Sequence, residues 1–162
     1  MLIIISKNVS MSAYIYCRVS TPNQSRFSDG HVSLETQEDT CREYCARVKL
    51  NIVNVVREVG SARNLDKLDE HKRLVRTMPN DSTLVIYNVS RFSRNLLQGL
   101  LIADKLRKKG IKVFSVVEGC SYGGNVAERH LFNTTMCFTE HQSAVLSENM
   151  KRNIAYRRRM GH

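Results

Sequence analysis

A serine and an arginine stand two residues apart near the start of the chain, where an apolar run ends. Residues 13–19 read Ala-Tyr-Ile-Tyr-Cys-Arg-Val, a run typical of a buried strand, and Pro22 cannot continue such a strand. Because side chains alternate along a strand, we expect Arg18 and Ser20 on the same side of it. This would place a nucleophilic hydroxyl beside a cation at a strand end, where active sites gather in parallel sheets. The alternative is a loop serine beside a surface arginine.

Two further arginines follow a later strand-like run. Residues 83–87 predict a strand, and Arg91 and Arg94 come after it, three residues apart, so that they can share a helix face. Since parallel strands end at one edge of a sheet, we expect these arginines to lie near Arg18 and Ser20. Guanidinium groups bind phosphate oxygens in pairs and stay charged. A serine among arginines therefore predicts cleavage of a phosphodiester without a metal.

Strand-like and helix-like segments alternate along the chain, and they must position these side chains. Strand and helix alternate four times, which predicts an α/β fold with a mostly parallel, four- to five-stranded sheet and helices on both faces. After the last of these strands, a glycine-rich loop is expected over residues 119–125. The strands are expected at residues 13–19, 50–56, 83–87 and 111–117. The helices are expected at residues 34–48 after Ser33, at a short stripe of Leu68, Leu74, Val75 and Met78, and from Leu96 to Gly110 with Leu96, Leu97, Leu100, Leu101 and Leu106 inward.

The last segment contains no proline or glycine from about Val126 to Arg159, which predicts one helix roughly 50 Å long. Such a helix must project beyond its own domain. A projecting apolar stripe needs a partner, most simply the same helix of a second subunit, so this is the expected dimerisation helix. The alternative is two helices with a break near Glu140. The stripe consists of Phe132, Met136, Thr139, Ser143, Leu146, Met150 and Ile154.

The chain is strongly basic, with 25 Lys and Arg against 15 Asp and Glu, a net charge of +10 and a pI near 9.7. This excess predicts a polyanionic partner, nucleic acid first and an anionic membrane surface second. A cationic cluster ends the long helix, where it suits contact with a phosphate backbone, and a solvated charged tail is the alternative. The cluster consists of Lys151, Arg152, Arg157, Arg158 and Arg159.

The cysteines and histidines indicate neither disulfides nor a metal site. The five cysteines are odd in number and match no zinc spacing, which predicts reduced thiols in the cytoplasm, with the DNA, or in a nucleus. No two histidines stand at metal-ligand spacing, so each is interpreted as a surface or packing residue. His31 alone, in the loop after Ser20, is a minor candidate for proton transfer. The apolar run of residues 2–5 is too short for a signal peptide or a membrane span.

Three motifs, in this order along nearly the whole chain, resemble the catalytic motifs of the serine recombinases of the resolvase/invertase family. The resemblance implies an N-terminal extension at residues 1–12, a catalytic domain at 13–125 and a dimerisation and DNA-contacting helix at 126–162. The motifs are Tyr16-Cys17-Arg18-Val19-Ser20-Thr21, Ser33-Leu34-Glu35-Thr36-Gln37 and Ser90-Arg91-Phe92-Ser93-Arg94-Asn95.

The resemblance implies site-specific DNA recombination. Ser20 would attack a DNA phosphodiester and form a 5′-phosphoserine link, which strand exchange and religation would follow. Members act on double-stranded DNA as homodimers that pair into tetramers, and they need neither metal nor cofactor. The implied site also includes Arg18, Arg91 and Arg94 around the phosphate, Gln24 and Gln37 as glutamines that help position the phosphate or the serine, and Glu140 as an acidic residue near the site.

Two departures from the family pattern keep alternatives open. Ser90 stands where the family commonly has an aspartate, and Lys67 falls at the position of a loop arginine, with Arg63 as a competing candidate. A catalytically impaired, architectural DNA-binding relative is therefore the second hypothesis. The third is an unrelated doubly wound domain that binds a nucleotide or a phosphoprotein, against which the absence of GxGxxG and P-loop motifs counts. Since no DNA-binding module follows the long helix, we expect the chain to be the catalytic part of a longer protein.

Overall fold

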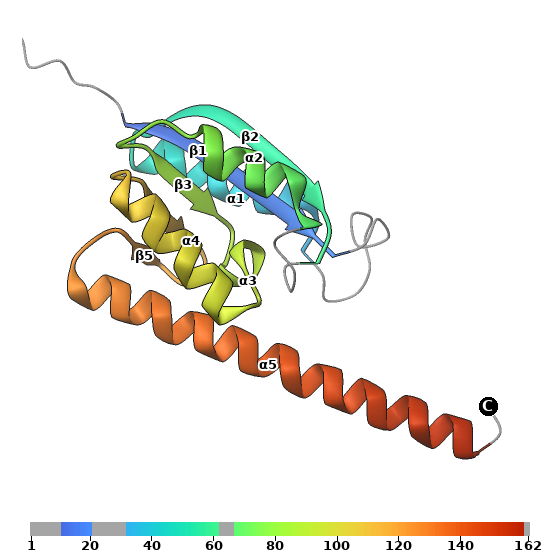
Figure 1. The fold of residues 1–162 in the computed structure, drawn as a ribbon. Helices are drawn as coiled ribbons and strands as arrows, with labels where there is room; N and C mark the ends of the chain where they lie inside the picture. Colours follow the sequence, from blue (N-terminus) through green and yellow to red (C-terminus); the bar gives the residue numbers. More distant parts are fainter. Residues whose placement is uncertain (1–10, 21–31, 62–66, 161–162) are drawn as a thin grey trace, which may run out of the picture.

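The chain folds around one five-stranded sheet with the strand order β2-β1-β3-β4-β5 (Figure 1). The computed structural model describes residues 11–20, 32–61 and 67–160. Strands β1 to β4 are mutually parallel, and β5 pairs antiparallel with β4. The elements are β1 (Ser12–Val19), α1 (Leu34–Arg47), β2 (Asn51–Val59), α2 (Asp69–Thr77), β3 (Thr83–Ile86), α3 (Val89–Phe92), α4 (Leu96–Lys108), β4 (Lys112–Ser115), β5 (Cys120–Tyr122) and α5 (Val126–Arg159).

The expected fold class is confirmed, with two short elements added. The stretch 119–125, expected as a glycine-rich loop, contains β5, and the four-residue helix α3 stands between β3 and α4. Both are too short to leave a periodic pattern, and tertiary contacts decide them. β1 begins at Ser12, one residue before its expected start, and residues 1–10 lie outside the described part of the chain.

The sheet is covered on both faces, because side chains of its central strands alternate between two cores. On one face, Ile15 and Cys17 of β1 pack with Cys41 and Cys45 of α1. On the other face, Tyr16 joins a larger core that α2, α4 and α5 complete. Arg18 belongs to this second face by the same alternation. All five cysteines are free thiols, and Cys137 alone among them is exposed.

The helix α4 packs by its small residues rather than by all its leucines. Leu106 is buried as expected, whereas Leu97 and Leu101 are 69% and 63% exposed, so the expectation that they face inward is wrong. The buried face is instead set by Gly99 and Ala103. A Cβ on Gly99 would clash with Met136 of α5 and with Ser93. The absence of a side chain at Gly99 therefore lets α4 approach α5 closely.

The last helix is a single element of 34 residues that crosses the body and then projects beyond it (Figure 1). The alternative with a break near Glu140 is wrong. Phe132 and Met136 are buried against the domain, whereas Leu146, Met150 and Ile154 are 65%, 63% and 47% exposed. The first part of the apolar stripe thus completes the chain's own core, and the second part is uncovered in the single chain. Among the described helices, none combines the length and the apolar character that a bilayer crossing requires.

Candidate active site

The carboxyl edge of the sheet brings the predicted residues of three segments together. The backbone N–H of Gly60 donates to the Val19 carbonyl at 2.8 Å, so the end of β2 stays beside the end of β1. Ser20 follows β1 directly and is half-buried. The helix α3, which contains Arg91, begins three residues after β3 ends. The ends of β1 and β2 and the short helix α3 therefore lie at one edge of the sheet.

Arg18 is fully buried and holds this edge together. Its Nε donates to the Arg91 carbonyl at 3.1 Å, its Nη2 donates to the Ser90 carbonyl at 2.9 Å, and its Nη1 donates to the Gly60 carbonyl. The expectation that Arg18 is presented together with Ser20 thus differs from the structure, in which the guanidinium is turned onto the backbone. The physical reason is that these carbonyls stand outside the sheet ladder and need donors, and a guanidinium supplies five in one plane.

The arginines form one electrostatic cluster. The pKa of Arg18 is lowered to about 10, first by burial and then by the nearby charges of Arg94 and Arg91. The pKa of Arg91 is also below its ordinary value, first because of burial and then because of Arg94. The Nε of Arg91 is buried without a hydrogen-bond partner in the described part of the chain. Mutually repelling cations, together with the unpaired Nε–H of Arg91, favour binding of an anion such as a phosphate.

Gln37 fixes the end of β1 from the side of α1. It is fully buried, its Oε1 accepts the backbone N–H of Arg18 at 3.1 Å, and its Nε2 donates to the Arg18 carbonyl at 3.1 Å. Nε2 also donates to the Val32 carbonyl at 3.0 Å. Of the two roles implied for this glutamine, these contacts favour positioning of the serine over contact with the phosphate.

The remaining candidates near the edge are placed unequally. The hydroxyl of Ser90 donates to Oδ1 of Asn88 at 2.8 Å, so this serine closes a local turn. Lys67 is exposed and precedes α2. Gln24, Arg63 and His31 lie outside the described residues.

Arg94 and Glu140 line one shallow hollow between α5 and the start of α4. Oε1 of Glu140 accepts the backbone N–H of Leu96 at 3.1 Å, while the side chain of Asn95 caps the same helix by accepting the Gln98 N–H at 2.8 Å. Glu140 therefore joins the long helix to the segment that contains Arg94. The hollow is lined by Arg94, Asn95, Glu140, Ser143, Ala144 and Ser147.

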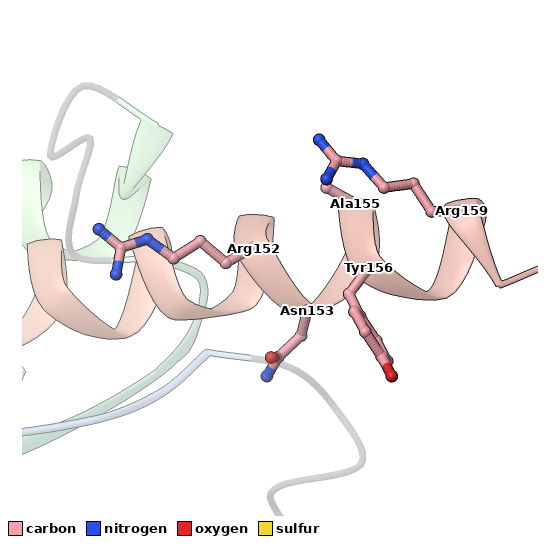
Figure 2. A pocket seen from close by; sticks show the side chains of 5 residues that line it. All are labelled: Arg152, Asn153, Ala155, Tyr156 and Arg159. Atoms are coloured by element: carbon pink, nitrogen blue, oxygen red, sulfur yellow. The ribbon is translucent and has the colours of Figure 1, made fainter.

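The basic cluster lies at the far end of α5, away from the sheet (Figure 1). Arg152 and Arg159 extend to one side of the helix, and Asn153 and Tyr156 extend to the other (Figure 2). Arg152 lies 3.8 Å from Glu148 in an exposed pair, which contributes little to stability. All members of the cluster are exposed, namely Lys151, Arg152, Arg157, Arg158 and Arg159.

Sequence reasoning missed two acidic residues that organise the edge. Glu58 accepts the Tyr16 hydroxyl at 2.7 Å and the backbone N–H groups of Glu70 and His71 at 3.0 and 3.1 Å. Glu118 accepts the backbone N–H of Val89, the first residue of α3, at 3.2 Å. The rule that active groups gather at strand ends points to Glu118, which follows the fourth strand. Glu58 carries no comparable signal, because it stands beside Arg57 in a strand end of mixed polarity.

The groups available for chemistry at this edge are a serine hydroxyl and the positively charged side chains of the arginines. In the ranges that the structure describes, no cluster of three or more His, Cys, Asp or Glu side chains could hold a metal ion. The guanidinium groups of Arg91 and Arg94 can stabilise negative charge on a substrate.

Known proteins share both the sequence pattern and the fold. The family described as "Resolvase, N terminal domain" matches residues 13–162. The catalytic domain of TP901-1 integrase has a TM-score of 0.64 at 23% identity, covering 84% of this chain and 98% of that one. A resolvase family site-specific recombinase from Streptococcus pneumoniae has a TM-score of 0.61 at 18% identity, covering 91% and 99%.

The third similar structure is the catalytic domain of ISC1926 TnpA, described as an IS607-like serine recombinase, with a TM-score of 0.55 at 21% identity, covering 90% of this chain and 99% of that one. No curated protein matches the sequence. Because the sequence identities to the solved structures are low, those structures show only the fold of this chain. The match to the family model shows which family the chain belongs to. The chain therefore belongs to the resolvase family of serine recombinases, the proteins of site-specific recombination.

Proposed function

We propose that this chain cleaves and rejoins DNA strands with Ser20 as the nucleophile. The Ser20 oxygen forms a bond to phosphorus, the bond from phosphorus to the 3′ oxygen breaks, and the 3′ oxygen leaves as a hydroxyl with a proton. The DNA 5′ end is then held as a phosphoserine ester, and the reverse attack by a 3′ hydroxyl after strand exchange restores the backbone. The electrostatic cluster of Arg18, Arg91 and Arg94, at the edge of the sheet where β1 ends just before Ser20, is the observation that carries this proposal.

The supporting roles follow from the contacts. Arg91 and Arg94 bind the scissile phosphate directly, whereas Arg18 holds the edge and turns to the phosphate only after it leaves its carbonyl partners. Gln37 keeps the end of β1 in place, and Gln24 is assigned to the phosphate by resemblance alone. Lys67, or Arg63 in its place, supplies the family's loop cation, and Ser90 takes the place of its aspartate.

Removing the Ser20 hydroxyl is the direct test. The 162-residue chain, fused to a DNA-binding module of known site, is incubated in EDTA with duplex DNA whose spacer carries a nick, so that a cleaved end diffuses away. We expect denaturing gels and mass spectrometry to show a 5′-linked protein–DNA adduct on Ser20. Ser20→Ala should form none, because it lacks the hydroxyl oxygen that bonds to the DNA phosphorus. Thr77→Ala, which removes an exposed hydroxyl at the end of α2, serves as the control and is expected to form the adduct.

A catalytically impaired DNA-binding relative is the second candidate. It is favoured by Ser90 in place of an acid and by the engagement of Arg18 with three carbonyls. DNA binding without an adduct, while an active family member reacts alongside, would support this second function and contradict the first.

We also propose that two chains pair through the uncovered part of the α5 stripe, and that two such dimers form the tetramer of strand exchange. In this arrangement residues 13–125 are the catalytic domain, residues 126–162 bring the basic cluster onto the DNA backbone, and residues 1–12 are an extension. The protein works where its DNA is, in the cytoplasm or in a nucleus.

The uncovered stripe gives a separate expected result. Replacing Leu146, Met150 and Ile154 together by serine should weaken dimerisation by at least about 100-fold, because a homodimer carries each substitution twice and loses six apolar side chains at about 0.5–1 kcal/mol each. Sedimentation velocity across a concentration series measures the change in dissociation constant. Val117→Ser, at an exposed position in the loop after β4, is the control. A wild-type chain that stays monomeric at high concentration would contradict the pairing.

A further inference from the structure

The short helix α3 is held in place by charges on both of its ends. Four residues cannot form a stable helix by themselves, since even longer isolated helices are marginal in water. At its carboxyl end, Arg18 donates to the carbonyls of Ser90 and Arg91 at 2.9 and 3.1 Å. At its amino end, both oxygens of Glu118 accept the backbone N–H of Val89, at 3.2 and 3.3 Å. An acid at the start and a base at the end is the arrangement that the helix dipole favours.

Glu118 takes the place of a missing cap. The residue before α3, Asn88, makes no capping hydrogen bond to this helix, and its Oδ1 instead accepts the Ser90 hydroxyl. The N–H of Val89 would otherwise be left without an acceptor at a buried position. The carboxylate of Glu118 therefore supplies from another loop what a local side chain usually supplies.

Glu118 is itself held on the sheet. Its Oε2 accepts the hydroxyl of Ser115, the last residue of β4. The loop that contains Glu118 continues the pairing of the strands, because the Val116 N–H donates to the Ile86 carbonyl at 3.0 Å and the Val117 N–H donates to the Tyr87 carbonyl at 2.9 Å. Through these contacts, Glu118 fixes the position of α3 relative to the edge formed by β3 and β4.

We propose that Glu118 is a positioning residue for Arg91: it fixes α3 against the sheet edge and so sets where the Arg91 guanidinium meets the scissile phosphate. This inference rests on the proposed function for its effect on cleavage, but its structural part is independent of it. Neither Glu118 nor its contacts belong to the residues assigned above from the sequence.

The experiment compares Glu118→Leu and Glu118→Gln with wild type in single-turnover adduct formation at saturating DNA. We expect Glu118→Leu to form the adduct about 10- to 100-fold more slowly with unchanged DNA affinity, since small displacements of a catalytic group cost this much. Glu118→Gln keeps an acceptor for Val89 and should fall between the two. Glu128→Leu is the matched control, because the Glu128 carboxylate likewise accepts a serine hydroxyl, that of Ser121, and also accepts the side-chain N–H of Asn125, the residue before its own helix, at 3.3 Å.

A double-mutant cycle with Arg91→Lys separates positioning from general stability. If Glu118 acts through Arg91, Glu118→Leu should slow the Arg91→Lys chain much less than it slows wild type. Equal slowing in both backgrounds, or slowing by Glu128→Leu to the same extent, would overturn the proposal.

Hydrogen exchange supplies a readout that needs no DNA cleavage. The Ser93 N–H donates to the Val89 carbonyl at 3.2 Å, so it reports whether α3 is formed. Faster exchange at Ser93 in Glu118→Leu, with unchanged exchange in β3, supports the proposal, and unchanged exchange at Ser93 overturns it. If wild type forms no adduct, the proposed function fails, and the exchange result still decides whether Glu118 positions α3.

Discussion

Replacing Arg18 by methionine is expected to lower the free energy of unfolding by about 2–5 kcal/mol. The substitution removes three charge-assisted hydrogen bonds, to the carbonyls of Gly60, Ser90 and Arg91, each worth about 1.5–3 kcal/mol. Against this loss stands the relief from burying a charge, which a pKa lowered to about 10 puts at about 3 kcal/mol. The hydrogen bonds outweigh the burial cost, because the substitution leaves one buried and two partly buried carbonyls without their donors.

Denaturant unfolding of Arg18→Met, Arg18→Lys and Arg57→Met measures this effect. A lysine cannot reach three carbonyls at once, so Arg18→Lys should lose most of the same stability. Arg57 is a half-exposed arginine paired with Glu38, and its replacement should cost about 0–1 kcal/mol. An unfolding midpoint for Arg18→Met equal to that of wild type would show that the buried contacts contribute nothing. Loss of activity in an Arg18 variant must therefore be corrected for folding before it is assigned to phosphate binding.

Acid should destabilise the chain through His71, by about 3 kcal/mol in full. His71 is fully buried, and neither ring nitrogen has a hydrogen-bond partner in the described part of the chain. Its ring lies 5.2 Å from that of Tyr16 and 5.4 Å from that of Phe92, between centroids. Burial, and then the charge of Arg18, lowers the pKa of His71 to about 4 from an ordinary 6.5.

The sign follows from where protons bind. Between pH 6.5 and 4 the unfolded chain protonates this histidine and the folded chain does not. The stability is therefore fully present above pH 6.5 and falls as the pH drops toward 4. His71→Leu should remove this pH dependence and be neutral or slightly stabilising at pH 7, because an unpaired buried polar ring is replaced by an apolar group.

Thermal or denaturant unfolding across pH 4 to 7 checks the prediction for His71. His130→Leu, at an exposed position on α5, is the control and should keep the wild-type slope. Carboxylates that titrate at lower pH are common to all three chains and cancel in the comparison. The same slope in His71→Leu as in wild type would contradict the role assigned to His71.

The sequence predicted those elements whose signal is local. Alternation of strands and helices, the cap at Ser33 and the long final helix without proline or glycine all follow from local rules, and all are present in the structure. The parallel course of β1 and β3 also followed, and it is what places the end of β1 and the start of α3 at one edge of the sheet. His71 was interpreted as a surface or packing residue, and it is a packing residue.

What could not be predicted depends on where loops meet. The three carbonyls on Arg18 come from the residue after β2 and from the four-residue helix α3, whose backbone course no periodicity encodes. The outward turn of Leu97 and Leu101 follows from the close contact at Gly99, which is a property of two helices and not of one. Glu118 acts on a helix 29 residues away along the chain, so its role is visible only in three dimensions.

The uncovered half of α5 links assembly to conformational entropy. A short helical segment without tertiary contacts, such as the one beyond Ser147, is marginally stable in water. In a single chain this segment gains little contact free energy to offset the entropy cost of ordering it. In a dilute chain this half should fray, and mass action on a second chain should order it. The part of α5 that carries the basic cluster is then fully helical only when two copies associate. Protein concentration therefore sets the fraction of chains that are ready to bind DNA.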